Sequence, residues 1–429
     1  MPIFYAAASY LAFLLLWPFL LFHRKTRRGH LRRLGFYPAG WMKGEAPMRI
    51  WLHGASAGDL LALKPMVFEL KRRFPGCVVV MSTLTNSGYE MARERLQEVD
   101  LVTYLPWDLP GATARAVAAI RPDVLILEYA EIWPNLIRSA QKRGVKIVLT
   151  NGRFDHEKLG AYRFLFSLIG NPLQKVDLLL MREDDEAERA LALGARAERV
   201  RVTGNTKFDN LAGAALGQSG AALARDIGAR ADQPLFIAGS THEGEEALLL
   251  PVFRRLREAH PDLRLMIAPR YVERAQRIVA LAESEGLTAG LRSQGAPDAD
   301  VVVLDSIGEL AAAYALATLV FVGGSFTSRG GQNILEPAAH GKPVLFGPNM
   351  ANFHDSVQVL VGRGGIQVPD PEKLYRVASD LLARPEKIVE LGELARAAVS
   401  SVRGASARNV VEIARLLGGK GEAAAEAAP

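Results

Sequence analysis

Short runs rich in Val, Ile and Leu alternate with helical segments along most of this chain, in two successive series. The first series of strand-like runs covers residues 49–53, 78–83, 124–127, 146–150, 177–181 and 199–203. The second covers residues 235–238, 265–268, 301–304, 319–322, 344–346 and 365–368. Such alternation predicts parallel sheets with helices on both faces. Because 429 residues exceed one ordinary core, we predict an α/β protein with two Rossmann-like, doubly wound domains facing a cleft.

The composition between the two series predicts the domain boundaries. Residues 211–232 are rich in Ala and Gly and read as a linker, so we expect an N-terminal domain over 45–220 and a C-terminal domain over 230–417. Residues 418–429 are of low complexity, and we expect a flexible tail there.

The N-terminal segment predicts a membrane anchor. Residues 3–22 contain no charge and are long enough to cross a hydrocarbon core as a helix. They lack the leading charges and small-residue end of a signal peptide. We therefore expect an anchor over 1–25, followed by a basic arm to about residue 44 that is drawn to anionic lipids and keeps the catalytic domains on the cytoplasmic side. Pro18 leaves open whether the helix spans the membrane or is partly inserted.

The net charge of +6 is confined to that basic arm. Residues 1–44 carry seven Lys and Arg and no acid, so the remaining 385 residues have a net charge of −1. Without a basic pattern interleaved with aromatics in the globular part, nucleic acid is disfavoured as a partner. The single cysteine, Cys77, excludes an intrachain disulfide framework and reads as a small core residue.

Residues 321–347 (FVGGSFTSRGGQNILEPAAHGKPVLFG) combine a strand end, two glycine pairs and a short helix. Gly323, Gly324 and Ser325 follow the buried run 319–322, at the end where open α/β sheets bind ligands. Backbone N–H groups there and the N-terminus of a helix over 333–340 suit a phosphate. Glu336 stands three residues after Asn333, where its carboxylate can face ribose hydroxyls. The alternative is that the glycines only make tight turns and Glu336 is a surface or capping residue.

Other loops of the second series converge on the same edge. The loop GSTHEGEE follows the strand 235–238, and Ser240 or Thr241 is a natural helix cap, whereas His242 is expected to be an exposed loop residue. The strand 265–268 ends in Pro269 and Arg270, whose guanidinium can bind phosphate bidentately. Gly308 and Glu309 follow the strand 301–304.

In the first series, carboxylates follow two strand ends. Asp59 comes after the small-residue loop 54–58, which includes Ser56 and Gly58. A carboxylate there can take a proton from an acceptor hydroxyl, or it can merely complement the dipole of the helix that it begins. Glu131 lies just past the strand 124–127, and Thr85 belongs to a hydroxyl-rich loop at the same edge. These residues predict an acceptor site.

Several other chemistries are rejected on spacing. The chain has no GxxxxGK[ST], no GxGxxG after a strand and no Cys/His cluster for zinc. Asp298 and Asp300 precede a strand and so lie at its amino end, away from the ligand edge. We expect no metal site.

Taken together, these motifs resemble the Kdo transferases, which transfer 3-deoxy-D-manno-octulosonic acid (Kdo) from CMP-Kdo to lipid A precursors. The motifs HGASAGD, EIWPN, NGRF, VTGNTKFD, GSTHEGEE, APR, GEL, FVGGS and GGQNILEPAAHGKPVLFGP occur in the family's order from the anchor to about residue 417. The resemblance implies a GT-B glycosyltransferase of the inner membrane. CMP-Kdo would be a substrate, and no cofactor is expected.

The resemblance assigns roles residue by residue. The donor-binding set comprises Ser240, Pro269, Arg270, Gly308, Glu309, Gly323, Gly324, Ser325, Asn333 and Glu336. The acceptor side comprises Ser56, Gly58, Thr85, Glu131 and Lys207. Asp59 is implied to be the general base and Arg270 a catalytic residue that stabilises the leaving phosphate.

The chain departs from the family's pattern at three places. Asp59 stands where Glu is usual, which draws the carboxylate back by roughly 1.5 Å. Tyr129 replaces a common acid, and Gln332 stands where His is common. These departures leave two alternatives open: a GT-B transferase for another CMP-ulosonic acid or acceptor, and a catalytically silent CMP-Kdo-binding envelope protein.

Overall fold

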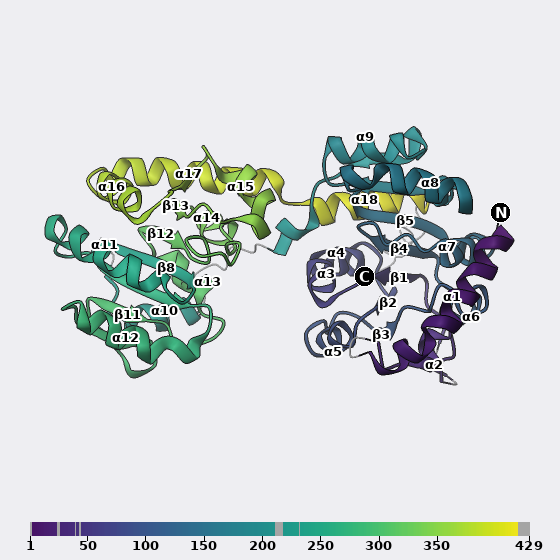
Figure 1. The fold of residues 1–429 in the computed structure, drawn as a ribbon, viewed down its shortest axis with the longest axis horizontal. Coiled ribbons are helices and arrows are strands. Elements are labelled where there is room, and N and C mark those ends of the chain that lie inside the picture. The colour runs from purple at the N-terminus through teal and green to yellow at the C-terminus, as the bar shows by residue number, and fades with distance from the viewer. Residues whose placement is uncertain are drawn as a thin grey trace, which may run out of the picture. The chain divides into compact units, whose positions relative to one another are not determined.

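The computed structural model describes residues 2–23, 26–38, 40–42, 44–210, 218–230 and 232–418. The chain divides into two compact units. The first takes the described residues up to Asn210 together with those from Arg403 onward, and the second takes those between (Figure 1). Residues 419–429 of the tail, most of the predicted linker and basic residues 24, 25 and 43 lie outside the described residues.

The first unit is built on a parallel sheet. Within its described residues, seven strands lie in the order β3-β2-β1-β4-β5-β6-β7. Their bounds are β1 Arg49–His53, β2 Val78–Thr83, β3 Leu101–Tyr104, β4 Val124–Glu128, β5 Lys146–Gly152, β6 Leu178–Met181 and β7 Val200–Val202. Its helices are α1 Pro2–Phe22, α2 His30–Arg33, α3 Ala57–Ala62, α4 Lys64–Arg73, α5 Asn86–Arg95, α6 Pro110–Ile120, α7 Pro134–Gln141, α8 Leu159–Ile169, α9 Asp184–Ala192 and α18 Ala405–Leu416.

The second unit repeats this architecture. Its described strands form a second seven-stranded parallel sheet in the order β10-β11-β9-β8-β12-β13-β14. The strands are β8 Leu235–Thr241, β9 Arg264–Pro269, β10 Ala289–Leu291, β11 Val301–Val303, β12 Leu319–Val322, β13 Val344–Phe346 and β14 Gly365–Gln367. The helices are α10 Gln218–Asp226, α11 Glu245–Ala259, α12 Ala275–Ser284, α13 Leu310–Leu316, α14 Leu335–Ala339, α15 His354–Leu360, α16 Pro371–Leu382 and α17 Pro385–Val402.

Alternating side chains along each strand supply both faces of each sheet. In β1, Trp51 joins one core cluster with residues of α6 and α7, while Ile50 and Leu52 join another with residues of α4 and α18. Both faces are therefore apolar, which explains why the strands read as continuous apolar runs. The predicted doubly wound fold is confirmed. The sequence missed β3 and β10, which are short and lie at sheet edges.

The last helix corrects the predicted C-terminal boundary. Residues 230–417 are not one domain, because α18 packs on the first sheet through Val410, Ile413 and Ala414. Asp209 accepts hydrogen bonds from the backbone N of Gly404 (2.6 Å) and Ser406 at the start of this helix. The chain thus leaves the first unit after residue 210 and returns to it at Arg403.

The basic arm is partly built into the fold. Arg33 is fully buried, with its guanidinium 4.2 Å from the ring centroid of Tyr104 and 5.0 Å from that of Trp107. It donates hydrogen bonds to the carbonyls of Arg28 and Leu84. Arg33 is therefore not one of the arm's charges that can reach an anionic lipid.

Candidate active site

Polar side chains of the first unit gather where three neighbouring strands end. His53 closes β1, Glu128 closes β4, and Thr150 and Asn151 lie near the end of β5. The three strands are adjacent and parallel, so these ends share one edge of the sheet. This is the edge at which open α/β sheets bind ligands.

Asp59 lies beside this edge as part of a helix cap. Its Oδ2 accepts hydrogen bonds from the backbone N (2.9 Å) and the Oγ (2.7 Å) of Ser56, which precedes α3. Asp59 and Ser56 thus form a capping box in the first turn of α3. Among the described residues, Asp59 accepts these bonds only through Oδ2, so its Oδ1 is available to an acceptor hydroxyl.

Glu128 is a buried carboxyl group next to Asp59 that sequence reasoning did not single out. It is fully buried and accepts hydrogen bonds from Thr150 Oγ1 and Asn151 Nδ2, each at 2.5 Å. The pKa of Glu128 is raised to about 8, chiefly by burial and in smaller part by the charge of Asp59, against the lowering effects of these hydrogen bonds and of Lys207. Glu128 is therefore mostly protonated at neutral pH. The signal in the sequence was an acid that closes an otherwise apolar strand.

Tyr129 follows Glu128 in the chain, and its ring lies next to Lys207. Its backbone has a φ of 57°, and its buried hydroxyl has no hydrogen-bond partner among the described residues. Lys207, on the 3-10 helix η4 (Thr206–Asn210), places Nζ 5.3 Å from the Tyr129 ring centroid. Asn151 holds η4 in place, since its Oδ1 accepts from the backbone N of Thr206 (2.9 Å). Lys207 and Asp59 both act electrostatically on Glu128, so all three belong to one cluster.

Glu131 and Thr85 are engaged in local structure. Glu131 Oε2 accepts from Trp133 Nε1 (3.0 Å) and lies 3.3 Å from Nε2 of the buried His53. Thr85 caps α5 by accepting from the backbone N of Gly88 (3.0 Å). Gly58 is exposed, and a Cβ there would meet only Ser56 Oγ, at 3.9 Å.

In the second unit, four residues of the predicted donor set line one cavity of about 320 Å³. They are Ser240, Pro269, Arg270 and Gly308. The cavity lies beyond the carboxyl ends of β8, β9 and β11, and the exposed Arg270 can direct its guanidinium to an anion there. This edge is the one that the sequence predicted for the donor.

The glycine-rich loop after β12 is occupied by an internal carboxylate. The fully buried Glu245 accepts hydrogen bonds from the backbone N of Gly324 (2.7 Å), Ser325 (3.0 Å) and Phe326 (2.9 Å). Ser325 is also fully buried, and its Oγ donates to the carbonyl of Val322 and accepts from the backbone N of Gly347. Glu245 therefore already accepts from the backbone N–H groups of Gly324 and Ser325, two residues of the predicted donor set.

Gly323 serves close packing. A Cβ on Gly323 would lie 2.6 Å from the Cα of Thr241 and 2.8 Å from Glu245 Oε2. The backbone N of Gly323 donates to the carbonyl of Gly239 (2.9 Å). Only glycine fits where β12 passes this close to the end of β8.

The remaining predicted donor residues lie on separate elements. Asn333 accepts from the backbone N of Leu335 (3.1 Å), and α14 is five residues long, shorter than the helix predicted over 333–340. Burial raises the pKa of Glu336, a carboxyl in the first turn of α14. Glu309 pairs with Arg292 (2.8 Å) and accepts a hydrogen bond from Ser306, so its charge is already compensated.

His242 is buried, and the prediction of an exposed loop histidine is wrong. Its Nε2 lies 3.2 Å from Gln332 Nε2, and its ring lies edge-on to Tyr271. Burial lowers the pKa of His242, Glu245 raises it, and the charges of Arg270 and other arginines lower it again. A neutral imidazole next to arginine suits a region that receives an anion.

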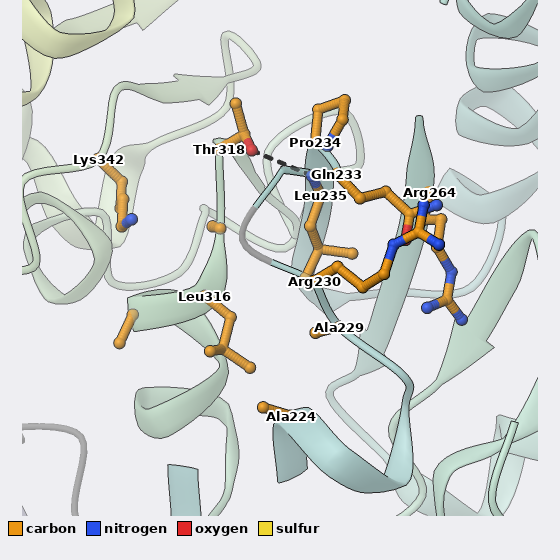
Figure 2. A pocket seen from close by; sticks show the side chains of 12 residues that line it. Ala224, Ala229, Arg230, Gln233, Pro234, Leu235, Arg264, Leu316, Thr318 and Lys342 are labelled. Atoms are coloured by element: carbon orange, nitrogen blue, oxygen red, sulfur yellow. Dashed lines mark hydrogen bonds between the residues drawn. The ribbon is translucent and has the colours of Figure 1, made fainter. Parts of the chain in front are cut away.

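A larger cavity of about 430 Å³ lies at the opposite edge of the second sheet. Figure 2 shows Arg230 and Arg264 on one side of it and Lys342 on the other. Leu235 begins β8 and Thr318 precedes β12, so this cavity is at the amino ends of the strands, away from the ligand edge. Within the described ranges, no group of three His, Cys, Asp or Glu side chains is arranged to hold a metal ion.

Comparison with known proteins identifies the family. A family model for 3-deoxy-D-manno-octulosonic-acid transferase matches residues 28–210. Over 416 residues the chain is 32% identical to the 3-deoxy-D-manno-octulosonic acid transferase of Bordetella pertussis, covering 92% of this chain and 95% of that one. It is 30% identical over 394 residues to the enzyme of the same name from Haemophilus influenzae, covering 90% of each chain.

The fold recurs in UDP-GlcNAc 2-epimerase from Neisseria meningitidis, with a TM-score of 0.60, 13% identity, and coverage of 86% of this chain and 100% of that one. The two doubly wound parallel sheets thus give the chain a GT-B-like fold. The similarity to the transferases of Bordetella pertussis and Haemophilus influenzae makes it a glycosyltransferase. The chain belongs to the 3-deoxy-D-manno-octulosonic acid (Kdo) transferase family.

Proposed function

We propose that this enzyme transfers Kdo from CMP-Kdo to a lipid A precursor such as lipid IVA, in lipopolysaccharide biosynthesis. The observation that carries the proposal is the similarity to Kdo transferases along nearly the whole chain. The reaction is a single displacement with inversion at the anomeric carbon. It uses no metal and no cofactor, and CMP-Kdo is a substrate.

Asp59 acts as the general base. Its Oδ2 is fixed by Ser56, and its Oδ1 takes the proton from the glucosamine hydroxyl that attacks the anomeric carbon. The neighbouring Glu128 supports this role, because a protonated Glu128 adds no second negative charge beside Asp59. Lys207 lies within the same cluster and can stabilise negative charge on the sugar.

Arg270 acts on the donor side. Its guanidinium at the 320 Å³ cavity pairs with the phosphate of CMP and stabilises the charge that develops as CMP leaves. Glu336 faces ribose hydroxyls in this proposal. Its raised pKa is the expected consequence of a carboxyl held in a poorly solvated position before the ligand arrives.

The proposal places the enzyme at the inner membrane, with both units on the cytoplasmic side. A single candidate membrane span among the described residues, Tyr5–Phe22, supports this location. The unit that carries Asp59 is then at the membrane that contains the lipid acceptor.

The direct test is to incubate the purified enzyme with CMP-Kdo and lipid IVA and to weigh the lipid by mass spectrometry. We expect a mass increase of one or more Kdo units. Asp59→Asn should lower the rate about 10²- to 10⁴-fold, the usual contribution of a positioned base. Asp185→Asn, an exposed acid of the same unit, is the matched control and should keep wild-type activity. Absence of any mass increase with the wild-type enzyme would remove the proposal.

A second candidate is a GT-B transferase for another CMP-ulosonic acid or another acceptor. The departures at Asp59, Tyr129 and Gln332 favour it, since the first two lie in the acceptor site and Gln332 contacts His242. A panel of CMP-sugars would show preference for a donor other than CMP-Kdo. A catalytically silent envelope protein would instead bind CMP-Kdo in calorimetry without turnover.

A further inference from the structure

One face of α1 is docked against the first unit along its length. Near its start, Tyr5 donates a hydrogen bond to Asp108 Oδ2 (2.9 Å), and Ser9 Oγ accepts from Asn135 Nδ2 (3.4 Å). The hydroxyl of Tyr10 accepts from the backbone N of Gly111 (3.1 Å). These partners precede or begin α6 and α7, which belong to the core of the unit.

The contacts continue to the other end of the helix. The ring of Phe13 lies 6.2 Å from that of Trp107, and the ring of Trp17 lies 5.4 Å from that of His30. Tyr5, Ser9, Phe13 and Trp17 follow one another at intervals of four residues, so they form a single stripe on α1. Figure 1 shows α1 lying alongside α6.

The opposite face of α1 is apolar and exposed. Its large side chains are between 60% and 83% exposed; they are Leu11, Leu14, Leu15, Phe19 and Phe22. The exposed face of α8, which touches α1, adds Phe164, Leu165 and Leu168. Exposed apolar patches of this extent on soluble surfaces mark interaction sites. Two exposed arginines border this surface: Arg27 follows the end of α1, and Arg163 lies on α8. Their positive charges suit anionic lipid head groups.

The docked stripe is incompatible with a helix that crosses the bilayer. If α1 spanned the membrane, Asp108 and Asn135 would either enter the hydrocarbon with it or lose their contacts to Tyr5 and Ser9. Asp108 also accepts from the backbone N of Asn135 (3.1 Å) and Leu136 (2.9 Å), so it fixes the start of α7. Loop and helix-end polar groups do not occur exposed to lipid tails.

We propose that α1 lies in the plane of the membrane interface, with its stripe on the protein and its outer face, continued by α8, in an anionic leaflet. The inference rests on the membrane location in the proposed function, and it specifies how α1 attaches the protein to that membrane. The anchor is monotopic, its N-terminal end stays on the side of the catalytic units, and the outer face sits at one depth along its whole length.

Cysteine labelling in spheroplasts tests the side on which α1 begins. Cys77 is buried and is replaced by Ala, and Pro2→Cys then provides one thiol near the start of α1. We expect a membrane-impermeant maleimide to label Pro2→Cys only after permeabilisation, as it labels the control Glu188→Cys, an exposed position in the first unit. Labelling of Pro2→Cys in intact spheroplasts, with Glu188→Cys still protected, would show a spanning helix and overturn the inference.

Depth measurements provide an independent readout. An environment-sensitive fluorophore is attached to single cysteines at the outward positions Ala8, Leu11, Leu15 and Phe22, in vesicles containing anionic lipid brominated at known depths. An interfacial helix gives the same shallow depth at all four positions. A spanning helix extends over about 20 Å between the first and last of them, so Leu11 or Leu15 would be deepest. Recovery of the full-length protein in the soluble fraction, without vesicle binding, would instead contradict the membrane location itself.

Discussion

Replacement of the buried carboxyl group of Glu128 by an amide should remove a pH dependence of stability. Glu128→Gln keeps the size of the side chain and an oxygen that can accept from Asn151. It removes the proton equilibrium that sets Glu128 apart from an exposed glutamate. The first unit should therefore become less sensitive to pH, and it should gain stability relative to the wild type at alkaline pH.

The direction follows from the raised pKa. The pKa of Glu128 is about 8 in the folded protein, against 4.5 for an ordinary glutamate. Between these values the folded state holds a proton that the unfolded state has released, so stability falls as pH rises through this window. Below pH 4.5 the contribution is fully present, and above pH 8 it is lost. Each pH unit inside the window changes the unfolding equilibrium about tenfold, so two units from pH 5.5 to 7.5 correspond to roughly 3 kcal/mol.

The distribution of tryptophan gives an assay specific to this unit. All five tryptophans lie at positions 17, 41, 51, 107 and 133, in the first unit. Urea unfolding followed by tryptophan fluorescence at pH 5.5, 6.5 and 7.5 thus reports on the unit that contains Glu128. The wild type should lose stability across this series more steeply than Glu128→Gln. Parallel pH profiles for the two proteins would refute the reasoning, because Glu128 would then be ionised in the folded state.

Three further predictions concern the donor side and the arm. Arg270→Ala should raise the KM for CMP-Kdo about 10- to 100-fold with the fold intact by circular dichroism, because a charge-assisted phosphate contact is lost; an unchanged KM would place the phosphate elsewhere. Glu245→Gln should lower the stability of the second unit by about 2 kcal/mol, measured by amide exchange at Gly324 and Ser325, and faster exchange only outside this loop would contradict it. Arg33→Met should lower the free energy of unfolding of the first unit by about 2–4 kcal/mol in the tryptophan assay, because it removes the contact with Tyr104 and the hydrogen bond to Leu84. The exposed Arg27→Met is the control and should leave the stability unchanged.

The central strands of both sheets were predictable because each is a buried run of apolar residues with a helix before or after it. Runs such as 319–322 and 344–346 match β12 and β13 at both ends. The edge strands β3 and β10 were not predicted, whereas the similarly short edge strands β7 and β14 were. The positions of Asp59 and Arg270 at ligand edges also followed from sequence, because a loop after a parallel strand always emerges at the same edge.

The hydrogen-bond partners and protonation states of the polar groups could not be predicted from the sequence. Gly324 and Ser325 have the composition of a phosphate loop, yet Glu245, 79 and 80 residues earlier in the chain, satisfies their N–H groups. Glu128 is one more acid in the sequence, and only its enclosure by Thr150 and Asn151 makes it a carboxyl that holds its proton near neutral pH.

The sequence by itself determined the alternation of strands and helices, the two sheets, the apolar helix at the N-terminus and membership of the Kdo transferase family. These properties depend on local periodicity and on motifs that are contiguous in the chain. Only the tertiary structure decided that α18 returns to the first unit, that Arg33 is buried, that one face of α1 is docked on Asp108 and Asn135, and that Glu245 fills the glycine loop. Each of these features depends on contacts between residues that are far apart in the sequence. Burial and charge compensation arise only from such contacts, so the sequence does not show them.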